Sequence, residues 1–243
     1  MAWASWVLLA ANVAAPAVSV GEGEVPAGWV VVEPPATDVE RPCGGHDSIG
    51  WAVSGETDRR ATIAPRSNRS PFVGITLPDG AMVGTNRGEW RGTIEWIPLK
   101  PSAGFVVENV NPVAVTQYSG EVFIAEGLAH GRRNNGMILR FERRDASNWR
   151  IHKFMDLGAA PIAAVRTGKS DWIVLTYNGV TRVDLARQRH WTLYENLEWA
   201  EQYPSSIRPL GRSWLIGTRN AVIRLVPLGS GYVEQRLVRV DCK

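Results

Sequence analysis

The sequence has few of the residues that build well-known metal and redox sites. It contains 2 cysteines and 4 histidines in 243 residues, and no histidines stand in H-x-H or HExxH spacing. It also lacks a G-x-S-x-G elbow, a phosphate-binding P-loop and a dinucleotide fingerprint. These absences argue against the corresponding hydrolases, nucleotide-binding enzymes and metalloproteases. We therefore expect neither a resident metal nor a cofactor.

Concentrated charge and helical apolar stripes are also missing. The formal net charge is only +3, and Lys and Arg are interspersed with Asp and Glu. A nucleic-acid-binding protein ordinarily gathers its basic residues on one face, so we expect no nucleic-acid partner. No segment repeats its apolar residues every 3.6 positions, and "LEWAEQY" at 197–203 is too short to form a substantial helix.

The one long apolar run lies at the N-terminus. "WVLLAANVAAPAV" at 6–18 has the length of a secretory h-region, and Ala15 and Ala17 provide an A-x-A-type cleavage site. No Lys or Arg precedes the run, although a secretory signal ordinarily has one. Asn12 and Pro16 interrupt it, so we expect no membrane span. We predict a signal peptide at 1–17, a linker at 18–27 and a secreted or periplasmic mature protein.

The two cysteines lie near the two ends of the predicted mature chain. In an exported protein, Cys43 and Cys242 are expected to form a disulfide that joins those ends. Closing so long a loop stabilises a fold by up to about 5 kcal/mol in the chain-entropy model. The alternative, two free thiols, applies if the protein stays in the cytosol.

An internal repeat gives the strongest structural signal. "WIVLTYNGVTRVDLARQRHW" at 172–191 matches "WLIGTRNAVIRLVPLGSGYV" at 214–233 without a gap, so that Trp172 corresponds to Trp214. Arg140, Arg182 and Arg224 share the same interval of 42 residues, and the segments around them alternate with the period of two that is typical of strands. Each unit contains four such segments, separated by Pro, Gly or polar turns.

Four short strands every 40 to 45 residues resemble the blades of β-propellers in general. We therefore predict an all-β fold, a single β-propeller domain at 28–243 with about five four-stranded blades. Four units are readable, near 67–109, 110–157, 158–199 and 200–243, and the fifth is 28–66. Trp172 and Trp214 are expected to fill the space between blades, and Asn178 and Asn220 to occupy turns. Strands from both chain ends are expected to complete one blade near the termini and close the ring. We expect a monomer.

One segment is similar to a particular propeller family. "FIAEGLAHGRRNNGMILR" at 123–140 resembles a strand–loop–strand segment of the five-bladed glutaminyl cyclases, which are exported enzymes. The F-T-x-G-L element that this family places earlier in the blade has no counterpart, because the chain reads "NPVAVTQYSG" there. The resemblance implies a cyclase-like activity as one alternative.

Three connections are longer than a propeller scaffold requires, namely 126–136, 86–92 and 196–206. We expect them to lie on one rim, because propellers usually bind ligands on the face formed by such connections. Trp90 and Trp199 fall outside the repeated positions, so packing between blades does not account for them, although each alternatively covers the core locally. The predicted ligand-binding residues are Arg87, Glu89, Trp90, Arg132, Arg133, Asn134, Trp199, Glu201 and Tyr203.

These features predict a binding module that recognises a protein or a glycan through its loop rim. The alternative is a propeller enzyme, either a glutaminyl-cyclase-like cyclase or a glycan hydrolase or lyase. Such an enzyme would use Glu126, His130 and Glu198 at the mouth of the channel, with Glu126 and His130 as an acid–base pair. A structural component of a larger envelope complex is a third possibility.

Overall fold

The computed structural model describes residues 16–34, 50–55, 57–67, 71–100, 103–145 and 148–240. Within them the chain forms five antiparallel β-sheets, which confirms the all-β prediction. The helical segments there are single turns, the 3₁₀ turn η1 (Gly88–Trp90) and α1 (Trp199–Gln202). No helix in this part of the chain has the length and apolarity needed to cross a bilayer.

Four sheets follow the predicted units, each built from four consecutive strands paired in order. The first contains β5 (Phe72–Leu77), β6 (Gly80–Thr85), β7 (Gly92–Pro98) and β8 (Phe105–Val110). The second contains β9 (Pro112–Tyr118), β10 (Glu121–His130), β11 (Arg133–Arg143) and β12 (Trp149–Asp156). The third contains β13 (Pro161–Arg166), β14 (Asp171–Thr176), β15 (Gly179–Asp184) and β16 (Arg189–Glu195). The fourth contains β17 (Ser206–Leu210), β18 (Ser213–Gly217), β19 (Val222–Leu228) and β20 (Gly231–Arg239).

The sequence predicted a fifth four-stranded unit at 28–66. The structure instead divides the N-terminal strands between two sheets. Strands β1 (Val18–Gly21), β3 (Trp51–Ser54) and β4 (Arg60–Pro65) form a three-stranded sheet in the order β1-β4-β3. The expected linker at 18–27 therefore contains a strand, because Val20 is fully buried against the core. Strand β2 (Trp29–Val32) instead pairs with β20 and becomes the fifth strand of the last sheet. That sheet thus combines strands from both ends of the chain, as predicted.

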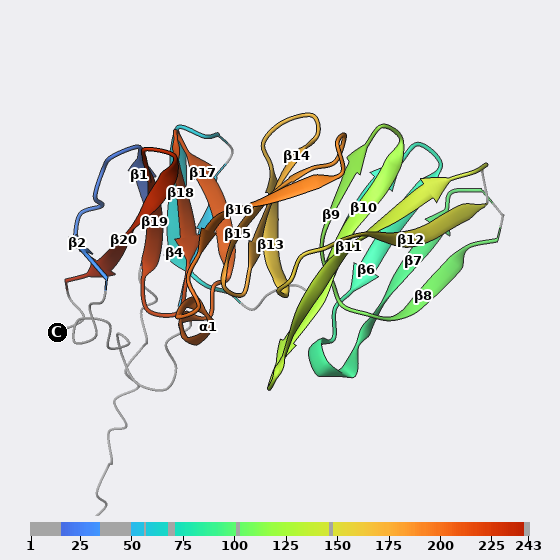
Figure 1. The fold of residues 1–243 in the computed structure, drawn as a ribbon, viewed down its shortest axis with the longest axis horizontal. Coiled ribbons are helices and arrows are strands. Elements are labelled where there is room, and N and C mark those ends of the chain that lie inside the picture. The colour runs from blue at the N-terminus through green and yellow to red at the C-terminus, as the bar shows by residue number, and fades with distance from the viewer. Residues whose placement is uncertain are drawn as a thin grey trace, which may run out of the picture.

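The five sheets pack one against the next and are seen side by side in Figure 1. The inner strands β5, β9, β13, β17 and β3 are neighbours in that order. Each interface between successive sheets encloses its own hydrophobic cluster. Trp172 belongs to the cluster between the β9–β12 and β13–β16 sheets, and Trp214 to the next one. The prediction that these tryptophans fill the space between sheets is confirmed.

The repeated arginines occupy matching places. Arg140, Arg182 and Arg224 lie on the third strand of successive sheets, each opposite the third residue of the second strand. Asn178 and Asn220 lie in the connections between second and third strands, as expected. The 42-residue interval is therefore the length of one sheet plus its connection to the next.

Two predictions fall outside the described residues. Cys43 and Cys242 lie there, and so does most of the predicted signal peptide, residues 1–15. The disulfide and the export signal remain predictions.

Candidate functional site

The three long connections lie on one side of the molecule. In Figure 1, η1, the tip of the β10–β11 hairpin and α1 are all on the lower side. The imidazole Nε2 of His130 lies 3.1 Å from a carboxylate oxygen of Glu89, which ties the hairpin to the connection around η1. The backbone N–H of Arg219 donates to the carbonyl of Gln202 at 2.8 Å, which ties the β18–β19 connection to α1. We call this side, with the β14–β15 turn, the rim.

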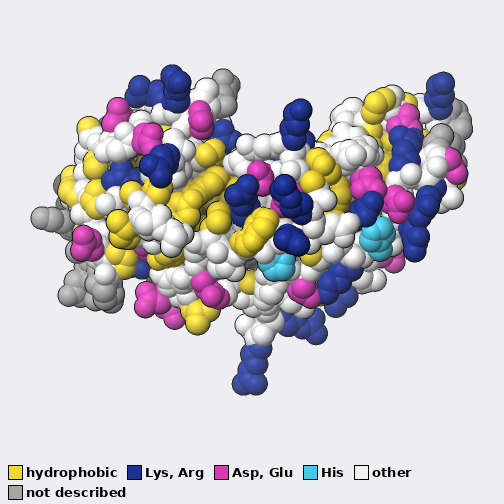
Figure 2. All heavy atoms as spheres, turned by 45° about the horizontal axis from the view of Figure 1, so that its top comes forward, with side chains coloured by type: hydrophobic (Ala, Val, Ile, Leu, Met, Phe, Trp, Pro, Cys, Tyr) yellow, Lys and Arg dark blue, Asp and Glu magenta, His cyan; other side chains and the backbone are white. Residues whose placement is uncertain are grey.

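The segment 126–136 was expected to be a long connecting loop because it is longer than the corresponding turns. In the structure it instead continues β10 and β11. The ladder runs on to the pair His130 and Arg133. Gly127 and Gly136 face each other within it, and a Cβ at either would lie closer than 3 Å to Pro161. The absence of side chains at the two glycines lets residues 159–161 pack against the hairpin. The part of the hairpin beyond them, residues 128–135, is called the arm. Figure 2 shows basic side chains at the end of a projection on the lower edge.

Trp90 is the most exposed aromatic side chain among the described residues, at 80%. The connection that carries it is held by Asn86, whose amide oxygen accepts from the N–H of Gly88 at 2.9 Å and whose amide nitrogen donates to the carbonyl of Pro112 at 3.2 Å. The indole is therefore presented on an anchored turn. Exposed basic side chains share this part of the rim, namely Arg87, Arg91, Arg132 and Arg133.

Asn134 has a structural role at the base of the arm. Its amide nitrogen donates to the side-chain oxygen of Asn178 at 3.3 Å, and its oxygen accepts from the N–H of Ala160 at 2.8 Å. Both bonds join the hairpin to the next sheet. Asn134 was predicted to bind ligand. In the structure both polar atoms of its side chain form hydrogen bonds within the protein.

The prediction of Trp199 as a ligand contact is wrong, because its side chain is fully buried. Its indole N–H donates to Oε2 of Glu234 at 2.9 Å. Glu234 lies on β20, 35 residues away, so no local pattern could have shown this partner. Trp199 fixes α1 to the last sheet and is unavailable to a ligand.

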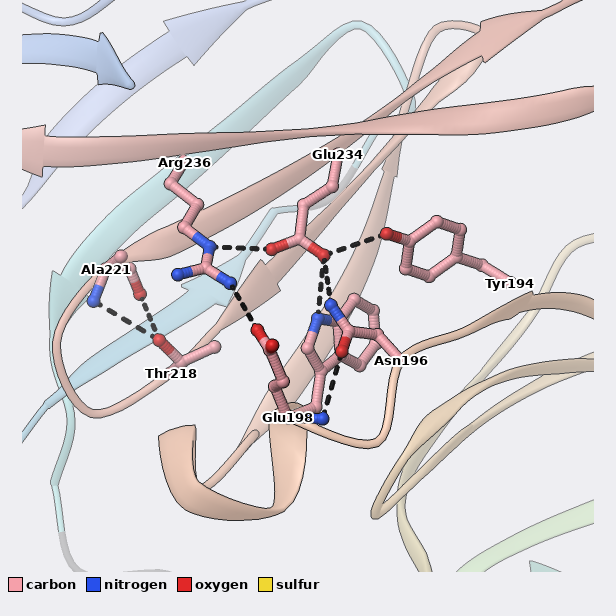
Figure 3. Close-up of polar contacts among 8 residues, drawn as sticks. Tyr194, Asn196, Glu198, Thr218, Ala221, Glu234 and Arg236 are labelled. Carbon is pink, nitrogen blue, oxygen red and sulfur yellow. Dashed lines mark hydrogen bonds and ion pairs between the residues drawn. The ribbon is translucent and has the colours of Figure 1, made fainter. Parts of the chain in front are cut away.

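Glu234 is the centre of a buried polar network, shown in Figure 3. It accepts from the hydroxyl of Tyr194 and the amide of Asn196, both at 3.0 Å, and its other oxygen accepts from Nε of Arg236 at 2.7 Å. The side chains of Glu234 and Arg236 are 2% and 3% exposed. Burial and the adjacent Glu234 carboxylate raise the pKa of Tyr194 to about 12. No local sequence pattern indicates this network, because its members are distributed over two sheets.

The remaining predicted residues near α1 are exposed. The Glu198 side chain is 68% exposed, with one oxygen 3.7 Å from Nη2 of Arg236, and Glu201 is also exposed. The ring of Tyr203, which is 42% exposed, lies 3.7 Å from the guanidinium carbon of Arg219. Glu198 thus helps to neutralise a buried cation.

The structure does not bring Glu126 and His130 together as a pair. Both residues lie on β10, where four residues extend over about 13 Å. His130 instead pairs with Glu89, as described above. Any chemistry of Glu126 therefore involves other groups.

Glu126 departs from the repeat. The corresponding position at the end of the second strand is Thr85, Thr176 and Thr218 in the other three four-stranded units. The hydroxyls of Thr176 and Thr218 donate to the backbone carbonyls three residues further on, those of Gly179 and Ala221. At Glu126, Oε2 instead accepts from the N–H of Asn111. Burial raises the pKa of Glu126, while the N–H of Asn111, 3.3 Å from Oε2, and the charge of Arg91 oppose this rise. The side-chain oxygen of Asn111 is itself buried and has no hydrogen-bond partner among the described residues.

Replacing Glu126 by Gln tests this account of its environment. A carboxyl whose pKa is raised on folding stabilises the protein below the unfolded value of 4.5, and this contribution is lost as the pH rises through the folded value. Gln cannot ionise, so E126Q should be more stable relative to wild type at pH 7 than at pH 4. Urea denaturation at both pH values measures this difference. The control is E108Q, at an exposed position on β8. Its stability relative to wild type should be the same at pH 4 and pH 7. If E126Q and E108Q respond to pH in the same way, burial does not raise the pKa of Glu126.

Among the described residues, no group of three or more His, Cys, Asp or Glu side chains is arranged to hold a metal ion.

Comparisons with known proteins leave the family open. No family model matches the chain. No curated protein matches it. Among solved structures it is similar to apo AztD from Citrobacter koseri, with 12% identity and a TM-score of 0.36. The alignment covers 89% of this chain and 58% of that one, and so weak a likeness carries no functional argument.

Proposed function

We propose that the protein is an exported β-propeller that binds a protein or a glycan through its rim. The observation that carries the proposal is Trp90, an indole 80% exposed on an anchored turn beside the basic arm. At 80% exposure, the indole of Trp90 contributes little to packing. Tryptophan and arginine are the residues most often responsible for binding energy at interfaces.

Chain connectivity supports a ring. The β1-β4-β3 and β5–β8 sheets are at opposite ends of the packed row, but only residues 66–71 link Pro65 of β4 to Phe72 of β5. Such a link spans at most about 25 Å. Five sheets packed in a straight row, about 10 Å apart, would separate their ends by about 40 Å. A row that curves back on itself, as the blades of a propeller do, would bring the two ends within reach of this link. Export is inferred from residues 1–17.

The exposed charges of the rim indicate the sign of the charge on the ligand. Arg87, Arg132 and Arg133 are exposed near Trp90, whereas Glu89 is engaged by His130. This arrangement favours a ligand with negative charge that also presents a ring or an apolar face to the indole. A rigid rim binds such a ligand with little loss of conformational entropy.

Replacing Trp90 by Ala should weaken binding at least about 30-fold, as expected for a central aromatic contact worth about 2 kcal/mol. The measurement compares wild type and W90A on an array of neutral and acidic glycans and in pull-downs from the cell envelope. W191A is the matched control, because Trp191 is 44% exposed but lies on β16 outside the rim. The proposal fails if W90A keeps every interaction that wild type and W191A share.

A second candidate, a propeller enzyme, is favoured by Glu126. Its partly buried carboxyl, with a raised pKa, is suited to proton transfer at the rim. If the protein is such an enzyme, E126Q loses turnover but still folds. If it is a binding module, E126Q binds the rim ligand like wild type.

A further inference from the structure

Two of the repeated arginines are neutralised in the same way. Arg182 on β15 holds Asp171, the first residue of β14, through Nε and Nη2, each 3.0 Å from a different carboxylate oxygen. Arg140 on β11 pairs with Glu121, the first residue of β10. The repeat thus places a carboxylate at the start of the second strand to meet the arginine of the third.

The fourth sheet keeps the arginine but lacks the carboxylate. Arg224 takes the place of Arg140 and Arg182, but the first residue of β18 is Ser213. The guanidinium donates through Nε to Gln235 at 2.9 Å and through Nη1 to the carbonyl of Glu24 at 2.8 Å, and no carboxylate in the described part of the chain pairs with it. Arg224 is nevertheless only 6% exposed, and this burial lowers its pKa. Burying a cation without a counter-charge is costly.

A cavity of about 390 Å³ adjoins this arginine. Arg224 and Ser213 line it together with Arg212, Gln235 and Glu22. The carboxylate of Glu22 is held by the backbone N–H of Arg212 at 2.9 Å rather than by Arg224. The cavity lies at the opposite end of β18 from the rim, so it is separate from the surface around Trp90.

We propose that this cavity binds the carboxylate group of a small organic anion. The carboxylate lies near the place that Asp171 has in the preceding sheet and accepts from Nη2 of Arg224, because Nε and Nη1 already donate to Gln235 and Glu24. The hydroxyl of Ser213 donates a further hydrogen bond. Glu22 keeps one negative charge in the cavity, which favours a singly charged ligand over a phosphate. A hydrogen bond from a guanidinium to a carboxylate is charge-assisted and about twice as strong as a bond between neutral groups.

The substitution Ser213→Asp supplies the missing carboxylate from the chain itself. The experiment compares thermal unfolding in sodium acetate and in sodium chloride of equal ionic strength at pH 7. Wild type should unfold roughly 2–4 °C higher in acetate at about five times its Kd. S213D should unfold higher than wild type in chloride and show no further rise in acetate. Arg182→Gln, which breaks the pair in the preceding sheet, should keep the acetate-dependent rise.

Three results would overturn the proposal. The first is the absence of an acetate-specific rise in wild type, and the second is an equal rise in wild type and S213D. The third is a rise with inorganic phosphate but not with acetate. If S213D does not fold, Arg224→Gln takes its place, and an acetate-dependent rise that persists in R224Q counts against the site.

Discussion

Glu234→Ala is expected to lower the free energy of unfolding by about 3–5 kcal/mol, the usual cost of removing one partner of a buried ion pair. The truncation removes the carboxylate that lies 2.7 Å from Nε of the buried Arg236, whereas Glu198, 3.7 Å from Nη2, is exposed. It also removes the acceptor of the indole N–H of Trp199, which is fully buried. Unsatisfied buried donors add to the loss. Chemical denaturation measures the change, which is a large fraction of the stability of a typical domain.

Two further variants separate the network from general effects of charge. E195A removes an exposed carboxylate from β16 and should change the unfolding free energy by less than about 0.5 kcal/mol. The double variant E234L/R236M replaces both charges by apolar groups and should be more stable than E234A, because no charge stays buried alone. An E234A protein as stable as E195A would show that the network does not hold α1 in place.

The interval of 42 residues predicted the four complete sheets because local chemistry defines each of them. Strands alternate buried and exposed residues, and Pro, Gly and Asn mark their ends, so the sequence itself carries the signal. The positions of Trp172 and Trp214 between sheets followed from the same repeat. The division of the N-terminal part did not, since β1 and β2 have four residues each and pair with strands far away in sequence. Their register depends on which edges the other sheets leave open.

The rim was predicted less well than the scaffold. Connection lengths placed η1, the hairpin and α1 on one side, but residue type alone could not distinguish Trp90 from Trp199. Both lie outside the repeat, and only the buried acceptor on Glu234 makes Trp199 a core residue. The extra length of 126–136 suggested a loop, whereas the pairing of Leu128 with Asn135 continues the ladder. Tertiary contacts here override local propensity.

Replacing Trp172 by Ala should lower the unfolding free energy by about 3–5 kcal/mol, as expected for a large aromatic removed from a packed core. The side chain is 2% exposed and packs between two sheets with Phe123, Leu157 and Val183. Because each sheet is covered by its neighbours, a cavity at one interface exposes surface of both. Urea denaturation followed by circular dichroism measures the loss.

Trp191 provides the matched control, since it lies in the same sheet, is 44% exposed and has the guanidinium of Arg182 5.8 Å from its ring centre. W191A should cost about 1 kcal/mol or less, the value of an exposed cation–π contact. If W172A and W191A lower the unfolding free energy equally, packing between the sheets does not contribute more to stability than an exposed contact does. A loss confined to W172A would tie the interval of 42 residues to the burial of one sheet by the next.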